Sequence, residues 1–298
     1  MCDDMWLISS FLEYLLYERN YSAGTVAYYK ADVEELQRFI KENAGDLSPA
    51  EVDSSLIRQW IVSLMAKKMK ASTLNRKLSS IRAYYKHLLR RGEVTVDPML
   101  KVTGPKKEKP LPVFLKESEM DRLLDDVDFG DGFEGCRDHL IIEMFYVTGM
   151  RLAELVGLDR VDVDFASSLI KVTGKRNKQR LIPFDESLKE AMLAYINLRN
   201  ETVPESCEAF FVNEKGSRVS RHIVSEIVKR NLSKVVTVRK RSPHVLRHTF
   251  ATAMLNHEAE LGAIKELLGH ESLATTEVYT HTTFEELKKV YNQAHPRA

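Results

Sequence analysis

The sequence predicts a mainly α-helical protein of two domains, the second of which also contains a small antiparallel sheet. Apolar residues recur at helical spacing through most of the chain, and capping residues precede several of these stretches. A segment rich in lysine and proline interrupts them, and 298 residues is long for one compact domain. We therefore expect an all-helical domain at residues 1–104, a basic linker at 105–111 and a mixed, mostly helical domain at 112–298.

Four helices are expected in the first domain. Residues 5–19 carry apolar side chains at helical spacing. Ser22 and Asp53 are suitable N-caps for a second and a third helix, because their side-chain oxygens can accept from backbone N–H groups. A fourth helix is expected to begin after Ser72 and to end at Gly92.

The fourth helix is expected to have one apolar and one polar face. The polar face combines small residues with cations: Ser72, Arg76, Ser79, Ser80, Ala83, Lys86, His87 and Arg90. Small residues beside long cations let a helix approach a duplex while the cations reach phosphates. A helix that merely faces solvent explains the same pattern equally well.

The net charge of +1 hides a strong asymmetry between neighbouring segments. Residues 1–57 contain eleven acids against four Lys and Arg, whereas residues 58–109 contain fourteen Lys and Arg against three acids. A basic block of this kind suits a polyanionic partner, although a solvated surface is its commoner explanation. In the linker, Lys106 and Lys107 lie between prolines that stiffen the segment, which suits a strap along a phosphate backbone.

Several classes of protein are excluded by what the sequence lacks. No run of 18 apolar residues is present, so no membrane span is expected. The first residues are acidic rather than basic, which argues against a signal peptide. The three cysteines are far apart and lack CxxC spacing, so we expect neither disulfides nor zinc, and a cytoplasmic location.

The second domain is expected to place a basic hairpin between helices. Strands at residues 168–173 and 180–184 flank a tip that contains Gly174, Lys175 and Arg176. The expected helices are Glu117–Val127, His139–Thr148, Glu186–Asn200, Arg221–Lys234, Pro243–Asn256, Leu261–Leu268, Leu273–Tyr279 and Phe284–Gln293.

Two places in this domain suit an anion. His244 and Arg247 share a face in the first turn of a helix, where unpaired N–H groups favour negative charge. Arg151 follows a Thr-Gly turn, and its planar fork fits two phosphate oxygens if Glu154 orients it. An ordinary ion pair between Arg151 and Glu154 is the simpler alternative.

Single residues elsewhere allow more than one interpretation. Lys175 at the hairpin tip can protonate a leaving oxygen, but Arg176, Lys178 and Arg180 qualify equally by position alone. His270 after a glycine and Tyr279, one of eleven tyrosines, would each be ordinary structural residues if read alone. A metal site built from the histidines lacks any HExxH or paired-carboxylate pattern, so no metal is expected.

Taken in order, six residues resemble the catalytic set of the tyrosine recombinases: Arg151, Lys175, His244, Arg247, His270 and Tyr279. The flanking strings are similar too, as in TGMRLAEL at 148–155, VTGKRNKQRLIP at 172–183, PHVLRHTFAT at 243–252 and LLGHES at 267–272. The resemblance covers nearly the whole chain, and the first domain is similar to the core-binding domain of that family. The size and the final residues 295–298 are most similar to the bacterial XerC/XerD branch.

The resemblance implies an enzyme that breaks and rejoins DNA through a 3′-phosphotyrosine, without metal, ATP or another cofactor. Tyr279 would be the nucleophile, and Arg151 and Arg247 would stabilise the charge on the phosphate. His244 and His270 would donate hydrogen bonds or help to move the tyrosine proton. Lys175 would protonate the leaving oxygen, and Glu154 would support Arg151.

The resemblance also implies the partners. Contacts to a double-stranded recombination site are expected from Arg76, Lys86, Arg90, Lys106, Lys107 and Arg176. A homo- or hetero-tetramer on DNA is expected, with a second XerC/XerD-type recombinase and activation by a cell-division DNA translocase. In the tail 282–298, the apolar face of Phe284, Leu287 and Tyr291 looks too small to serve one domain, so docking into a neighbouring protomer is expected.

Chromosome dimer resolution is the expected role. The alternatives are an integrase or excisionase of a mobile element and, from a different class, a catalytically silent DNA-binding protein.

Overall fold

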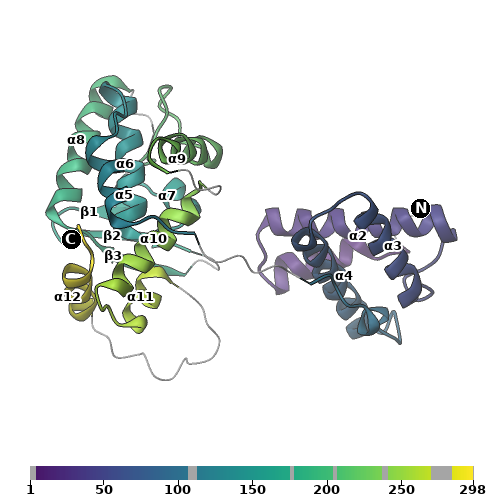
Figure 1. Ribbon diagram of the computed structural model, residues 1–298. Helices are drawn as coiled ribbons and strands as arrows, with labels where there is room; N and C mark the ends of the chain where they lie inside the picture. The colour runs from purple at the N-terminus through teal and green to yellow at the C-terminus, as the bar shows by residue number, and fades with distance from the viewer. Residues whose placement is uncertain are drawn as a thin grey trace. The chain divides into compact units, whose positions relative to one another are not determined.

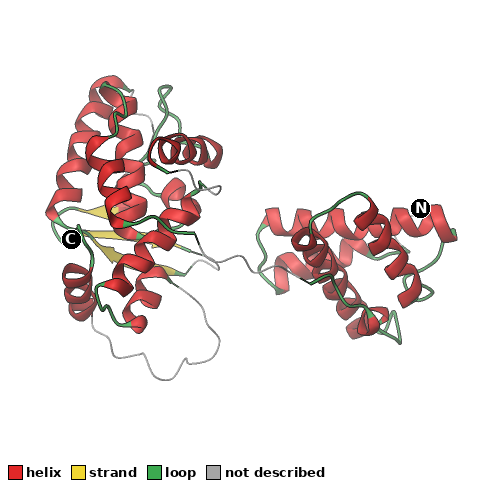
Figure 2. Ribbon diagram, in the orientation of Figure 1, coloured by secondary structure: helices red, strands yellow, loops and turns green. Residues whose placement is uncertain are grey.

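The computed structural model describes residues 5–106, 113–174, 178–203, 207–236, 241–269 and 284–297, with the backbone alone at 284–288. The chain divides into two compact units, Met1–Pro110 and Leu111–Ala298 (Figure 1). Helices dominate both units, and among the described residues the sheet belongs to the second (Figure 2). The predicted fold class is confirmed. No helix in these described ranges is long and apolar enough to cross a membrane.

The first unit is all helical over its described residues. Its elements are α1 (Ile8–Glu13), the π-helical turn η1 (Tyr14–Glu18), α2 (Ala23–Ala44), α3 (Ser54–Ala66), α4 (Ala71–Arg91) and the 3₁₀ turn η2 (Pro98–Lys101). The side chains of Ser22 and Asp53 accept backbone hydrogen bonds at the starts of α2 and α3, as predicted. Gly92 ends α4 in the left-handed conformation, but Lys70 rather than Ser72 is the N-cap residue.

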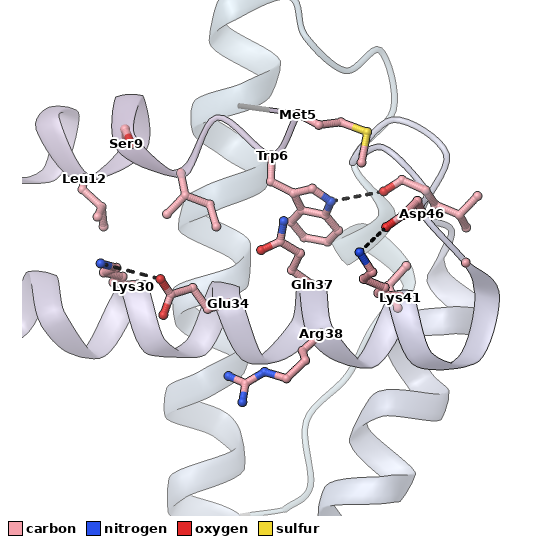
Figure 3. Close-up of a pocket in the computed structure, with 14 residues that line it drawn as sticks. Met5, Trp6, Ser9, Leu12, Lys30, Glu34, Gln37, Arg38, Lys41 and Asp46 are labelled. Carbon is pink, nitrogen blue, oxygen red and sulfur yellow. Dashed lines mark hydrogen bonds and ion pairs between the residues drawn. The ribbon is translucent and has the colours of Figure 1, made fainter. Parts of the chain in front are cut away.

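Aromatic residues fix the start of the chain against α4. The rings of Trp6 and Tyr84 stack with centroids 6.0 Å apart, and the Trp6 indole N–H donates to the Leu47 carbonyl at 3.1 Å. The indole borders a groove of about 480 Å³ beside α2 (Figure 3). Ion pairs between Lys30 and Glu34 and between Lys41 and Asp46 line this groove, together with Arg38.

The predicted polar face of α4 is partly wrong. Ser80 and His87 are buried, because the Ser80 hydroxyl donates to the buried Asp32 carboxylate of α2 at 2.7 Å and His87 packs beside Phe11. The spacing along one helix does not reveal a buried acid on another helix. The residues of this face that stay exposed are Ser72, Arg76, Ser79, Lys86 and Arg90.

The second unit packs helices around α6 and beside a small sheet. Its elements are α5 (Glu117–Asp121), η3 (Arg122–Asp126), α6 (Gly132–Thr148), α7 (Leu152–Gly157), η4 (Arg160–Asp162), β1 (Val163–Asp164), β2 (Leu169–Thr173), β3 (Gln179–Pro183), α8 (Glu186–Thr202), α9 (Arg221–Val235), α10 (Pro243–Asn256), α11 (Leu261–Leu268) and α12 (Phe284–Ala294). The helix α6 is buried on nearly all sides and packs against α8 and α10. It begins seven residues earlier than the predicted His139, and the predicted helix Leu273–Tyr279 lies outside the described residues.

The sheet is antiparallel in the order β1-β2-β3, and β2 and β3 form the predicted hairpin. Strand β1 pairs with β2 over two residues, which is too short for an alternating pattern to predict it. The register places Ile170 opposite Ile182 and Val172 opposite Arg180. Because side chains two residues apart on a strand share a face, Arg180 lies on the same face of the sheet as the buried Ile182.

The end of the chain packs on its own unit. Tyr291 and His295 are buried, and the His295 ring lies 5.0 Å from Tyr146 and 5.5 Å from Phe250, between ring centroids. Because the Arg297 backbone N–H donates to Nδ1 of His295, the proton on Nε2 is left to donate to the Tyr146 carbonyl at 3.2 Å. Of the apolar face expected at Phe284, Leu287 and Tyr291, the described member Tyr291 therefore packs within its own unit, and the side chains of Phe284 and Leu287 lie outside the description.

Candidate catalytic site

A glycine turn places Arg151 at the start of α7. Gly149 ends α6 with a φ of +59°, and a Cβ there would lie 2.5 Å from the ring of Phe250 and 2.9 Å from Leu268. Glycine is the residue that adopts this conformation without strain and without this clash. The tight turn sends Arg151 out between α6 and α7, where it becomes the N-cap residue of α7.

Glu154 lies at the centre of the hydrogen-bond network of the site. Its side chain is 1% exposed, and it accepts from the Arg151 backbone N–H and from Arg151 Nη1, both at 2.7 Å. Nη1 and Nη2 of Arg180 donate to its two oxygens at 2.8 and 2.9 Å. Burial alone would raise the pKa of Glu154, but the hydrogen bonds and charge of Arg180 and Arg151 outweigh burial and hold that pKa below its usual range. The carboxylate stays ionised between two guanidinium groups.

Arg247 joins this cluster from the first turn of α10. It is 7% exposed, and its Nη1 and Nη2 donate to the carbonyls of Gly149 at 2.5 Å and Leu268 at 2.6 Å. Burial, followed by the positive charges of Arg151 and Arg180, lowers the pKa of Arg247 to about 10. The guanidinium remains protonated at neutral pH, so three cations share one carboxylate and the site favours an anion.

The remaining predicted catalytic residues are described only in part. His244 is exposed in the first turn of α10, three residues before Arg247, as expected. Lys175, Arg176, His270 and Tyr279 lie outside the described residues.

Two chain neighbours of those residues do converge on the cluster. A Cβ on Gly174 would lie 3.3 Å from Glu154 Oε1, and one on Gly269 would lie 3.5 Å from Arg151 Nη1. The described ends of the hairpin tip and of α11 therefore meet at Arg151.

Arg180 is the residue of this cluster that the sequence analysis did not select. By position alone, it was one of several cations near the hairpin tip that could equally serve as the general acid. Its position opposite Val172 gives the missing signal, because an arginine on the inward face of a strand needs an acidic partner. Its actual contacts are Glu154 and the Leu267 carbonyl, to which Nε donates at 2.7 Å.

The predicted DNA-binding residues of the first unit differ in their surroundings. Arg76 pairs with Asp32 at 2.6 Å and retains 42% exposure of its side chain, whereas Arg90 donates to the Tyr14 hydroxyl at 2.6 Å. Lys86 is exposed, and within the described ranges it forms no ion pair with an acid. Lys106 is exposed, and Lys107 lies outside the described residues. Their contacts with DNA stay a prediction.

No group of three potential metal ligands from His, Cys, Asp and Glu comes together in the described part of the chain. Nε2 of His257, one of the nine histidines of the chain, lies 3.1 Å from the Glu117 carboxylate.

Two family profiles match this chain. The Phage integrase family matches residues 113–286, and the N-terminal SAM-like domain of phage integrases matches residues 8–92. A tyrosine recombinase XerC of Chlorobaculum tepidum is 37% identical over 320 aligned residues, covering 98% of this chain and 95% of the relative. A tyrosine recombinase XerC of Staphylococcus saprophyticus is 38% identical, with 97% of each chain covered.

The fold also matches solved structures. XerH recombinase bound to palindromic difH substrate in a post-cleavage complex has a TM-score of 0.75 at 19% identity, covering 97% of this chain and 95% of that one. The Tn1549 transposon integrase in complex with circular intermediate DNA has a TM-score of 0.70 at 20% identity, covering 96% and 98%.

The chain belongs to the phage integrase family. Within it, the chain is a tyrosine recombinase close to XerC, an enzyme of site-specific recombination that breaks and rejoins DNA.

Proposed function

We propose that this enzyme cleaves and rejoins DNA through a 3′-phosphotyrosine at Tyr279. The observation that carries the proposal is the cluster of Arg151 and Arg247 around one buried carboxylate, at the two arginine positions of the family's catalytic set. Two guanidinium groups held close together against their mutual repulsion make a site for a phosphate.

In the proposed first step, the Tyr279 oxygen attacks the scissile phosphorus while the bond to the 5′-oxygen breaks. The tyrosine proton passes to the imidazole of His244 or His270, and Lys175 donates a proton to the leaving oxygen. The products are a 3′-phosphotyrosine and a free 5′-hydroxyl. In the second step the 5′-hydroxyl of a partner strand attacks the phosphotyrosine and restores the tyrosine.

The arginines stabilise the charge that builds on the non-bridging oxygens in the transition state. Glu154 holds the guanidinium of Arg151 at 2.7 Å, so the donor is in place before the substrate arrives. Donors that need no reorganisation contribute most, and removal of one such donor costs about 100- to 1,000-fold in rate. His244 and His270 complete the proposed set of donors.

The reaction exchanges one phosphodiester for another phosphate ester, so the proposed mechanism needs no ATP. The positive charge that a metal ion would otherwise bring to the phosphate comes from Arg151, Arg247 and Lys175. We therefore propose that the enzyme acts without metal or another cofactor.

For the biological role we propose chromosome dimer resolution in the cytoplasm. The relatives named XerC, matched over nearly their whole length, support this role. The proposed partners are a double-stranded recombination site, three further protomers, a second XerC/XerD-type recombinase among them, and a cell-division DNA translocase. The similarity in fold to a transposon integrase keeps integration of a mobile element as the second candidate.

Within the tail, Tyr291 and His295 are buried in their own unit, and their rings stack with centroids 5.6 Å apart. Docking of these two side chains into a neighbouring protomer would therefore require them to leave their own unit first.

A nicked suicide substrate tests the proposed chemistry. Cleavage of this DNA releases a short fragment, so the covalent complex accumulates instead of religating. The wild type is expected to become covalently attached to the DNA, and Tyr279→Phe is expected to bind the same DNA without attachment. A Tyr279→Phe variant that still attaches would contradict the assignment, and a wild type that attaches to no candidate site would favour a silent DNA-binding protein.

A further inference from the structure

The last turn of α11 is held by three arginines from three different elements. Consecutive carbonyls accept one hydrogen bond each: Leu267 from Arg180 Nε at 2.7 Å, Leu268 from Arg247 Nη2 at 2.6 Å and Gly269 from Arg151 Nη2 at 2.7 Å. These are carbonyls at the end of a helix, which lack partners within the helix and carry its partial negative charge. The α11 terminus thus compensates part of the repulsion among the guanidinium groups.

Arg180 differs from the other two arginines in how fully its donors are used. Its Nη1 and Nη2 donate to the two carboxylate oxygens of Glu154, and its Nε donates to the Leu267 carbonyl. All three guanidinium nitrogens therefore donate to protein groups. Arg151 and Arg247, by comparison, each donate to described protein groups from Nη1 and Nη2. Arg180 is therefore suited to hold protein groups rather than a substrate.

We propose that Arg180 is a positioning residue, which ties the carboxylate that orients Arg151 to the α11 turn that leads to His270. Through Glu154 it fixes the Arg151 guanidinium, and through Leu267 it fixes the turn whose next two carbonyls hold Arg247 and Arg151. Removal of Arg180 leaves Glu154 with one guanidinium and the Leu267 carbonyl without this donor. The proposal rests on the proposed cleavage chemistry and assigns a role within the same site.

The test is single-turnover cleavage of the suicide substrate at saturating DNA by the full chain and by Arg180→Ala. Displacement of a catalytic group by about 1 Å costs about 100-fold, so a loss of about 10- to 100-fold is expected, with DNA affinity changed less than about threefold. If Arg180→Ala does not fold, the same measurement is made on Arg180→Lys. Lysine keeps a charge at Glu154 but lacks the planar fork that also reaches Leu267, so a similar loss is expected.

Arg218 provides a matched control in the same unit. Its Nη1 donates to the carbonyls of Val156 at 2.8 Å and Leu158 at 3.1 Å, and its Nη2 pairs with the Asp159 carboxylate. Arg218→Ala therefore removes a similar set of bonds, none of which involves Glu154 or the α11 carbonyls. It is expected to cleave within about twofold of the wild type.

A second substrate separates positioning from general damage to the fold. A methyl group in place of one non-bridging oxygen makes the scissile phosphate neutral, so the arginines stabilise less charge. The loss caused by Arg180→Ala is expected to be several-fold smaller on this DNA. Equal losses on both substrates, or cleavage at the wild-type rate, would overturn the role of Arg180. A wild type that cleaves neither DNA would instead overturn the proposed function itself.

Discussion

Asp32 in the first unit and Glu154 in the second each have a side chain that is 1% exposed, and each binds two cationic side chains. Asp32 receives Arg76, Lys77 and the Ser80 hydroxyl, all from α4. Its bonds join the two helices α2 and α4 along one contact. Glu154 receives Arg151 and Arg180 from different elements, and both arginines reach on to α11.

The two clusters differ in how far their positive charges are neutralised. Lys77 is buried and is also bound by Glu35 at 2.6 Å, so the Asp32 cluster is largely complete within the first unit. The Glu154 cluster has an excess of positive charge, because Arg151, Arg180 and Arg247 lie around one carboxylate. A buried ion network can therefore hold two helices together in one place and preorganise an anion site in another.

The largest effect is expected from a methyl group at the α11 terminus. Gly269 has a φ of +61°, and a Cβ there would lie 3.3 Å from Arg180 Cδ and 3.5 Å from Arg151 Nη1. Gly269→Ala is expected to slow single-turnover cleavage about tenfold, because Arg180 must shift by a few tenths of an ångström while it holds the carboxylate that orients Arg151.

Gly92 is the matched control for this substitution. It also caps a helix, with a φ of +74°, but a Cβ there meets no heavy atom within 4 Å. Gly92→Ala shares the backbone strain of about 1 kcal/mol, yet it should cleave at nearly the wild-type rate. Equal slowing by both variants would mean that strain, and not the arginines, controls the rate.

A third buried carboxylate sharpens the comparison because no arginine or lysine lies within salt-bridge distance of it among the described residues. Glu143 Oε2 lies 3.7 Å from His139 Nδ1 and has no hydrogen-bond partner there. Burial, with a smaller effect from the charge of Asp185, raises the pKa of Glu143 to about 7. The raised pKa contributes stability that is complete below the usual carboxyl pKa of about 4.5 and is lost as the pH rises through 7.

Glu143→Gln should remove this pH dependence. Between pH 5 and pH 8, the wild type is expected to lose roughly 1–3 kcal/mol of unfolding free energy relative to the variant. Urea unfolding at the two pH values measures it. A constant difference between wild type and variant would show that the group does not titrate in this range.

The smallest effect is expected from the exposed cations of α4. Lys86→Ala should reduce the slope of log affinity against log salt by about 1 if Lys86 contacts a phosphate. It should leave the unfolding free energy within about 0.5 kcal/mol of the wild type, because Lys86 is exposed.

Arg76→Ala provides the contrasting case on the same helix. It removes two hydrogen bonds to the buried Asp32, so it should also lower stability by about 1–3 kcal/mol. A salt slope unchanged by both variants would remove this face of α4 from the DNA-binding surface.

The sequence predicted the features that arise from residues close together in the chain and those that the family resemblance implies. The caps at Ser22 and Asp53 and the hairpin of β2 and β3 involve residues close together in the chain, so local patterns were sufficient. The pair of Arg151 and Glu154 was also expected, because three residues along a helix place them together.

Contacts between distant segments that lie outside the family's catalytic set were not predicted. Ser80 contacts an acid 48 residues away, and Arg180 contacts a carboxylate 26 residues away and a carbonyl 87 residues away. No periodicity within one element reports on such a partner. Only the register of β3 against β2 shows that Arg180 faces inward.

Single-turnover cleavage by Glu154→Gln, beside Asp32→Asn, tests the central comparison most directly. The glutamine amide removes the charge that both arginines bind and turns a donor toward one of them, so cleavage at saturating DNA is expected to fall at least about tenfold. Asp32→Asn is expected to lose stability but to cleave within about twofold of the wild type below its unfolding transition. Wild-type cleavage by Glu154→Gln, or an equal loss in both variants, would contradict the assignment of one network to catalysis and the other to the fold.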